Sequence, residues 1–253
     1  MTNDSNRVAD VCAVVVAGGS GVRMGGSTRK PYLALLGKPL ILLTLERLCS
    51  VNEIAKTILV VHPDDIEMVR DQWGRKFAES CRVAAIVSGG VSRQESVWNG
   101  LMRTPEDLPV VLVHDAVRPL VRRETILEVI RAIREHGAAI AAAPMIATVK
   151  ESNDAGRIIA TRDRERLWQA QTPQGALRSL LIEAYEKLRR SGDSVTDDAQ
   201  VLERNGREVM IVRDTSDNIK VTTPCDLAVA EALLRWQQEQ GLDGSRHTGS
   251  EGG

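Results

Sequence analysis

The hydrophobic residues of this chain fall into short aliphatic runs that alternate with amphipathic stretches of helical period. Runs of this kind are typical of strands buried on both faces of a parallel sheet. The pattern predicts strands at residues 11–16, 57–61, 83–87, 110–113 and 138–143. It predicts helices at residues 40–49, 64–77, 92–102, 124–136, 177–190, 197–205 and 224–237. This order implies right-handed crossovers, and therefore an α/β fold with a mainly parallel sheet.

The alternation of aliphatic runs and amphipathic stretches is interrupted between residues 145 and 169, where the chain becomes polar and rich in arginine. The sequence Asn153-Asp154-Ala155-Gly156 predicts a tight turn between two short extended runs. We expect this segment to form a β-arm that projects from the domain. Because a two-stranded arm buries little surface of its own, it should pack on a second subunit, so we expect a homodimer.

Composition and charge limit the classes of partner. The 253 residues suit one large domain, which we place at residues 11–237, with a disordered N-terminus at 1–10 and a disordered tail at 238–253. Lys and Arg number 33 against 34 for Asp and Glu, so no overall field would draw the protein to nucleic acid or to an anionic membrane. No apolar run approaches the roughly 20 residues that span a bilayer, and we expect a cytoplasmic protein.

A glycine-rich loop follows the first predicted strand directly and reads Ala17-Gly18-Gly19-Ser20-Gly21-Val22-Arg23-Met24-Gly25-Gly26. Glycines allow backbone N–H groups to close on phosphate oxygens, and Arg23 and Lys30 add positive charge, so the loop suits a polyphosphate. Its spacing fits neither the dinucleotide-binding fingerprint nor the P-loop. For this segment alone, a flexible turn with solvated cations is the alternative.

A second candidate site follows the strand predicted at 110–113, in the sequence His114-Asp115-Ala116-Val117-Arg118-Pro119. In open α/β sheets, ligands bind at the carboxyl ends of the strands. Asp115 could ligate a Mg²⁺ ion that bridges phosphates, and Arg118 could bind a phosphate or a hydroxyl group. The alternative is an aspartate that caps the next helix and pairs with the arginine. We assign no chemistry to His114.

Seven segments, taken in order, resemble the 2-C-methyl-D-erythritol 4-phosphate cytidylyltransferase family of the non-mevalonate isoprenoid pathway: AGGSGVRMGG with Lys30, SGGVSRQESV, VHDAVRP, TVK, QTPQG, TDDA and DNIKVTTP. The resemblance covers about residues 11–235. It implies a Rossmann-like fold of the nucleotidyltransferase type and a homodimer that uses Mg²⁺ and binds CTP in the sheet crevice. The acceptor would be a small phosphorylated polyol, whose phosphate attacks the α-phosphorus of CTP.

The resemblance also assigns roles to individual residues. The catalytic cations would be Arg23, Lys30 and Lys220, the first two stabilising the pentavalent transition state. The nucleotide would be bound by Ala17, Gly18, Gly19, Gly90, Arg93, Ser96 and Ala116. The acceptor would be bound by Arg118, Thr196, Thr148 and Arg164, the last two reaching across the dimer from the arm. The metal would be associated with Asp115, with Asp217 as a weaker candidate.

Three positions depart from the family's usual pattern. Arg29-Lys30-Pro31 stands where the family commonly has Pro-Lys-Gln, which keeps Lys30 in register but alters its backbone restraint. Ala176 replaces the usual Phe after QTPQG, so we expect a packing group near the site to be lost. Val91 replaces a residue that is often polar and weakens the expectation of nucleotide contacts there.

Two other functions stay open at this point. A CDP-ribitol pyrophosphorylase shares the fold and the glycine loop, and Thr148-Val149-Lys150 and Thr196-Asp197-Asp198-Ala199 favour methylerythritol phosphate over a pentitol phosphate. A noncatalytic nucleotide-binding module could also keep the fold. Such a module should have lost the transfer residues, whereas Arg23, Lys30, Asp115 and Lys220 are all present.

Overall fold

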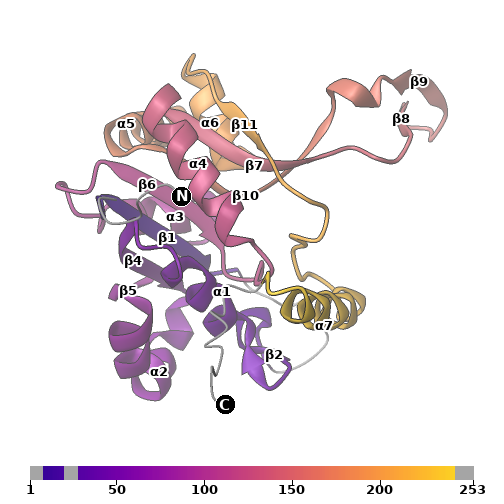
Figure 1. Cartoon of the computed structure of the whole chain (residues 1–253). Coiled ribbons are helices and arrows are strands. Elements are labelled where there is room, and N and C mark those ends of the chain that lie inside the picture. Colours follow the sequence, from indigo (N-terminus) through magenta and orange to yellow (C-terminus); the bar gives the residue numbers. More distant parts are fainter. Residues whose placement is uncertain (1–7, 20–27, 243–253) are drawn as a thin grey trace, which may run out of the picture.

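A mixed, mostly parallel sheet forms the centre of the computed structural model, which describes residues 8–19 and 28–242 (Figure 1). Within these residues the central sheet has seven strands in the order β11-β7-β10-β6-β1-β4-β5. Its strands are β1 (Val11–Ala17), β4 (Ile54–Val61), β5 (Val83–Ser88), β6 (Val110–Asp115), β7 (Ala138–Pro144), β10 (Trp168–Leu177) and β11 (Met210–Arg213). The predicted α/β class, the mainly parallel sheet and the projecting β-arm are confirmed.

Helices cover both faces of the sheet. They are α1 (Leu40–Cys49), α2 (Ile66–Cys81), α3 (Arg93–Leu101), α4 (Arg123–His136), α5 (Arg178–Ser191), α6 (Asp198–Arg204) and α7 (Pro224–Glu239). The described part of the chain also forms the short 3₁₀ turns η3 (Lys30–Tyr32), η4 (Pro63–Asp65) and η5 (Arg164–Arg166), and β2 (Ala34–Leu35) pairs with β3 (Lys38–Pro39). The predicted helices therefore form, with boundaries that shift by a few residues.

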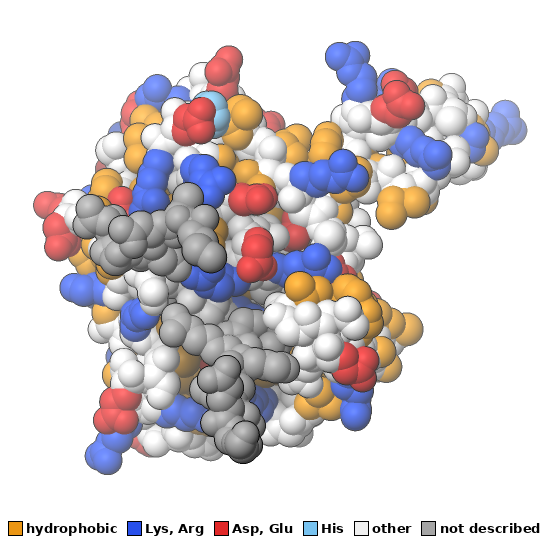
Figure 2. Space-filling model, in the orientation of Figure 1, with side chains coloured by type: hydrophobic (Ala, Val, Ile, Leu, Met, Phe, Trp, Pro, Cys, Tyr) orange, Lys and Arg blue, Asp and Glu red, His pale blue; other side chains and the backbone are white. Residues whose placement is uncertain are grey.

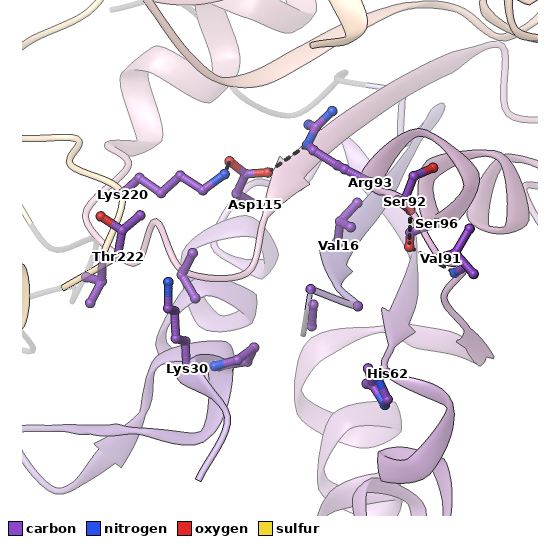
Figure 3. Close-up of a pocket in the computed structure, with 17 residues that line it drawn as sticks. Val16, Lys30, His62, Val91, Ser92, Arg93, Ser96, Asp115, Lys220 and Thr222 are labelled. Carbon is purple, nitrogen blue, oxygen red and sulfur yellow. Dashed lines mark hydrogen bonds and ion pairs between the residues drawn. The ribbon is translucent and has the colours of Figure 1, made fainter. Parts of the chain in front are cut away.

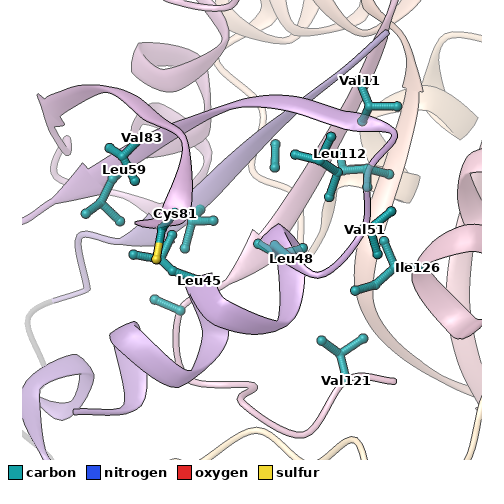
Figure 4. Close-up of a cluster of buried hydrophobic side chains, with 14 of the residues drawn as sticks. Val11, Leu45, Leu48, Val51, Leu59, Cys81, Val83, Leu112, Val121 and Ile126 are labelled. Carbon is teal, nitrogen blue, oxygen red and sulfur yellow. The ribbon is translucent and has the colours of Figure 1, made fainter. Parts of the chain in front are cut away.

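The sheet lies between two aliphatic clusters because side chains alternate along each strand. In β1, Val11, Ala13 and Val15 pack with α1, α2 and α4, whereas Cys12 and Val14 pack with α3, α5 and α6 on the opposite face. Figure 4 shows the first cluster, where Leu45 and Leu48 of α1 lie against the sheet. Burial on both faces explains why the central strands read as continuous apolar runs.

Strands β10 and β11 are absent from the sequence prediction. β10 pairs antiparallel with both β6 and β7, and it brings Gln171, Thr172 and Gln174 into the interior at 2–3% exposure. These side chains are buried through hydrogen bonds instead of apolar packing, so β10 lacks the aliphatic signal of its neighbours. β11 pairs parallel with β7 at the sheet edge, where Met210 and Ile211 remain about two-fifths exposed.

The arm consists of β8 (Val149–Ser152) and β9 (Ile158–Arg162), which pair antiparallel and extend away from the body of the molecule (Figure 1). Asn153 closes the turn, because its side-chain oxygen accepts hydrogen bonds from the backbone of Ala155 and Arg157. Hydrophobic and basic side chains reach the surface of the arm (Figure 2), and Ile146, Ile158 and Ile159 are more than half exposed. The packing of this arm on a second subunit stays a prediction.

The two ends of the chain lie largely outside the described residues. Helix α7 continues to Glu239, two residues beyond the predicted domain boundary, and the backbone oxygen of Leu242 accepts a hydrogen bond from Arg47. No helix among residues 8–19 and 28–242 combines the length and the apolar character needed to cross a membrane.

Packing of α3 on the sheet predicts opposite effects for two helical glycines. A Cβ at Gly100 would lie 2.5 Å from Val14 Cγ1 and 2.8 Å from Val60 Cγ2, whereas one at Gly74 in α2 would meet only Arg70 Cβ at 4.0 Å. Alanine gains about 1 kcal/mol over glycine in a helix, but overpacking costs about 1–3 kcal/mol. Gly100→Ala should therefore lower the free energy of unfolding and Gly74→Ala should raise it, as measured by urea denaturation. A stabilised Gly100→Ala would contradict the close contact of α3 with β1 and β4.

Candidate active site

Two pockets meet at the carboxyl ends of β1 and β6. The first has a volume of about 400 Å³, and among its lining residues are Ala17, Gly18, Gly19, Lys30, His62, Gly90, Arg93, Ser96, Asp115 and Lys220 (Figure 3). The second has a volume of about 260 Å³ and is lined by Arg93, Asp115, Arg118, Ala170, Gln171, Thr172, Gln174, Thr196, Asp197 and Lys220. Arg93, Asp115 and Lys220 line both pockets, so a ligand in each would meet at these three side chains.

The glycine loops after β1 and β5 contact each other through Ser96. The Ser96 hydroxyl is buried, accepts a hydrogen bond from Gly90 N at 3.0 Å and donates to Ser92 O at 2.9 Å. A Cβ at Gly18 would lie 3.0 Å from Ser96 Oγ, and one at Gly89 would lie 2.9 Å from it. Glycine is therefore required on both sides of this serine, and Ser96 fixes the distance between the two loops.

Helix α3 begins at the wall of the first pocket with an ordered N-terminus. Ser92 accepts a hydrogen bond from Glu95 N at 3.1 Å, and Glu95 Oε2 accepts one from Val91 N at 2.9 Å. The Glu95 side chain folds back over Gly90. A Cβ placed at Gly90 would lie 2.3 Å from Glu95 Cγ, so the side chain leaves no room for one. Val91 itself is fully exposed, so the loop offers backbone groups and no polar side chain at this position.

Lys30 reaches the opposite side of the first pocket from η3. The preceding Arg29 pairs with Asp64 at 3.0 Å and also with Asp65, which joins the segment to the end of β4. Tyr32 stacks on Trp73 of α2 with ring centroids 5.7 Å apart. These contacts supply a restraint on the Lys30 backbone at the place where the sequence departs from the usual Pro-Lys-Gln.

Asp115 at the end of β6 is the centre of a buried ion cluster. Its carboxylate lies 2.8 Å from Lys220 Nζ, 3.3 Å from Arg93 Nε and 3.6 Å from Arg118 Nε (Figure 3 shows the first two). Burial alone would raise the pKa of Asp115, but the charges of Arg93, Lys220 and Arg118 together lower that pKa below its usual range. The carboxylate is therefore ionised at any physiological pH.

Arg93 links this cluster to α6. Its Nη2 donates to Asp198 Oδ2 at 2.7 Å, and the fully buried Asp198 also accepts a hydrogen bond from the Tyr185 hydroxyl. Burial would lower the pKa of Arg93, but the carboxylates of Asp198 and Asp115 raise it. Gln174 holds the start of α6 in place, since its Oε1 accepts from the backbone N–H groups of Asp198 and Ala199.

A chain of neutral hydrogen bonds joins β6 to β10. Asp115 N donates to Thr172 Oγ1 at 3.1 Å, and His114 lies 3.0 Å from that oxygen through Nδ1 and 3.1 Å from Arg118 O through Nε2. Because a carbonyl only accepts, Nε2 carries the proton and Nδ1 accepts from Thr172. Burial lowers the pKa of His114 to about 4, which keeps the ring neutral at pH 7. Sequence reasoning gave His114 no chemistry, and the structure gives it a positioning role.

The sequence profile of the 2-C-methyl-D-erythritol 4-phosphate cytidylyltransferase family matches residues 11–236. The chain belongs to this family. It is 43% identical to the cytidylyltransferase of that name from Syntrophus aciditrophicus over 90% of this chain and 97% of that protein. Its identity to the relative from Alkaliphilus oremlandii is 38%, over 92% and 98%. The crystal structure of 4-diphosphocytidyl-2C-methyl-D-erythritol synthase from Anaerococcus prevotii matches with a TM-score of 0.79 and 32% identity, over 89% of this chain and 96% of that one.

The cytidylyltransferase fold brings most of the candidate residues to the two pockets. Arg118 and Thr196 line the second pocket, and Lys220 lines both. Ala116 is fully buried behind the first pocket, where its N–H donates to Val16 O at 3.0 Å. Ala176 lies in the core, paired with Val111 and Ala138, so the missing aromatic group does not open either pocket. Arg23 lies outside the described residues.

Three candidate residues lie away from both pockets of the single chain. Thr148 and Arg164 are exposed on the arm, where Arg164 Nη1 donates to Ile146 O at 2.6 Å. Asp217 pairs with Arg122 at 2.7 Å and accepts further hydrogen bonds from Thr215 and Gln237. Asp217 lines neither pocket, whereas Asp115 lines both.

Acid should weaken the fold through His114. A native pKa of about 4 against 6.5 for the unfolded chain means that the unfolded chain binds a proton first as the pH falls. Stability should therefore fall between pH 6.5 and pH 4 by about 3 kcal/mol in all, at 1.36 kcal/mol for each unit of pKa difference. His114→Asn should be less stable at pH 7.5 and should show a flatter dependence in urea denaturation from pH 6.5 to 4.5. An unchanged slope would exclude His114 as the titrating group.

Proposed function

We propose that this chain transfers the cytidylyl group of CTP to 2-C-methyl-D-erythritol 4-phosphate and releases pyrophosphate. The observation that carries the proposal is the junction of the two pockets at Arg93, Asp115 and Lys220, within a member of this family. A reaction between two phosphorylated substrates needs two adjoining pockets whose shared wall holds cations. The larger pocket suits the nucleotide and the smaller suits the polyol phosphate.

The first pocket offers the groups that a nucleoside triphosphate requires. Gly18 and Gly19 allow the backbone to approach phosphate oxygens, and Lys30 adds positive charge from the other side. Gly90 and the capped start of α3 suit the base and ribose through backbone contacts, because Ser96 already holds its own hydrogen bonds within the protein. Arg23 belongs to the same proposal through its place in the family motif.

In the proposed reaction, a phosphate oxygen of the acceptor forms a bond to the α-phosphorus of CTP as the bond from that phosphorus to the bridging oxygen of the β-phosphate breaks. Pyrophosphate carries away the electron pair of the broken bond. Lys220 would draw the acceptor phosphate to the junction, while Asp115 holds the lysine in position. Lys30 would stabilise the charge that develops on the nonbridging oxygens.

The residues fit a Mg²⁺ ion that arrives with the nucleotide. Asp115 supplies one carboxylate in the first pocket, and residues 8–19 and 28–242 hold no cluster of three or more His, Cys, Asp or Glu side chains suited to a metal. Mg²⁺ commonly binds through one or two carboxylates together with substrate phosphates and water. Bound there, it would neutralise charge on the triphosphate, and Asp115 would hold it in exchange for one of its present ion pairs.

The proposal includes a homodimer in which the arm of one subunit completes the acceptor site of the other. Thr148 and Arg164 lie on the arm, outside both pockets of their own chain, and Ile146, Ile158 and Ile159 expose apolar surface beside them. Exposed apolar surface of this kind is suited to an interface. Cytoplasmic location stays a prediction from the lack of a long apolar run, and the absence of nucleic-acid binding stays a prediction from the charge balance.

Pyrophosphate release tests the proposed reaction. The chain is offered CTP and Mg²⁺ with 2-C-methyl-D-erythritol 4-phosphate or with ribitol 5-phosphate, and we expect rapid release with the first only. Lys220→Met should lower kcat/KM for the acceptor by at least about 100-fold, since it removes a charged contact to the reacting phosphate. Preference for ribitol 5-phosphate would keep the chemistry and change the substrate. If neither acceptor gives pyrophosphate release, the proposal that the chain is catalytic is contradicted.

Mixed dimers test the shared site. Lys30→Ala and Arg164→Ala should each abolish most activity, because one removes a transfer cation and the other a contact made across the dimer. If the two residues serve one site from different subunits, a heterodimer of the two variants contains one intact site and should recover up to about half of the activity per dimer. Absence of recovery, after heterodimers are verified by differential tagging, would count against the arm as part of the partner's site.

A further inference from the structure

Among the described residues that line the second pocket, two buried side-chain atoms have no hydrogen-bond partner. They are Nε of Arg118 and Oε1 of Gln171, and both residues line this pocket. Arg118 Nε still has the Asp115 carboxylate at 3.6 Å, so its charge is compensated. Gln171 Oε1 has no such compensation. Buried polar atoms in native proteins are nearly always paired, and an exception beside a pocket points to a partner that arrives with a ligand.

The orientation of the Gln171 amide follows from its other end. Gln171 lies in β10 and is 3% exposed, and its Nε2 donates to Thr215 O at 3.0 Å. A flipped amide would set its oxygen against the Thr215 oxygen, so the nitrogen must face Thr215. The terminal torsion of glutamine is broad, and a small rotation can expose Oε1 to a ligand while Nε2 keeps its bond.

The other neutral polar groups of the second pocket are already engaged. Thr172 Oγ1 bonds to Asp115 N and His114, and Gln174 bonds to α6 through its oxygen and to Asp197 through its nitrogen. Thr196 donates to Gln200 Oε1, through its backbone N at 2.8 Å and through its hydroxyl at 3.4 Å. Arg118 and Lys220 suit the phosphate of an acceptor. Gln171 Oε1 is therefore an uncommitted neutral acceptor, which suits a hydroxyl group and not a phosphate.

We propose that Gln171 is a specificity-determining residue whose side-chain oxygen accepts a hydrogen bond from one hydroxyl of the acceptor polyol. The assignment rests on the proposed function. Among the described residues no protein donor lies within hydrogen-bonding distance of Oε1, so a hydroxyl of the polyol would pair this buried acceptor without displacing a protein hydrogen bond. A site with an unpaired buried acceptor rejects an analogue that lacks the matching hydroxyl more strongly than an apolar site would.

The experiment measures kcat/KM for 2-C-methyl-D-erythritol 4-phosphate and for its deoxy analogues, each lacking one hydroxyl, with the wild-type chain and with Gln171→Met. The wild type should lose about 10- to 100-fold on one analogue. For Gln171→Met, kcat/KM should be the same for that analogue and for the full acceptor within about threefold. Its KM for CTP should stay within about twofold of the wild-type value. The rate at saturating acceptor is measured separately.

The control variant is Gln237→Met. Gln237 is also a buried glutamine, but it is bonded at both ends, to Leu120 O and to Arg47, and it lines neither pocket. Gln237→Met should keep the wild-type preference among the analogues even if it lowers the free energy of unfolding. The wild-type chain alone can overturn the assignment, if no deoxy analogue is discriminated by more than about threefold. The same penalty in Gln171→Met as in wild type would also overturn it. A wild-type chain inactive with the full acceptor would overturn the proposed function itself.

Discussion

The site depends on one constraint, which is that the carboxylate of Asp115 must stay charged where almost no water reaches it. The side chain is 8% exposed, and an isolated buried carboxylate would be far too costly in free energy. Arg93 at the start of α3, Arg118 after β6 and Lys220 before α7 all approach it. The segments that carry Arg93 and Lys220, far apart in the sequence, are thereby drawn to one strand end, and these two cations form the wall shared by the two pockets.

A second layer holds these cations in place. Asp198 and Tyr185 fix Arg93, while Arg118 donates to Asn218 O at 2.7 Å, two residues before Lys220. Asn218 Nδ2 in turn donates to Thr172 O at 3.0 Å, which ties the Lys220 loop to β10. The polar residues of β10 are therefore buried for a reason. An aliphatic strand between β6 and β7 would keep the backbone oxygen at position 172, but it would lose the Gln171 amide, which anchors the loop before α7 by donating to Thr215 O at 3.0 Å.

The sequence predicts what periodicity and local spacing determine. Strands β1, β4, β5, β6 and β7 carry aliphatic runs, and the glycines and cations that follow β1 and β6 lie at the edge where parallel strands end. β10 escaped prediction because Gln171, Thr172 and Gln174 are polar and buried. His114 and Asp198 escaped functional assignment because their partners, Thr172 and Arg93, lie 58 and 105 residues away. A hydrogen bond across such a separation leaves no trace in a local pattern.

The net charge of the whole chain and the net charge around the first pocket differ in sign. The whole chain carries a formal charge of −1, which would not attract a nucleoside triphosphate. Among the described residues, the wall of the first pocket carries Lys30, Arg93 and Lys220 against Asp115, with Asp198 paired to Arg93 behind it, so the local sum is three minus two, or +1. Because the Debye length is about 8 Å at physiological salt, a polyanion responds to this local excess and hardly to the distant surface. Asp115 therefore both gathers the cations and leaves enough of their charge for phosphate.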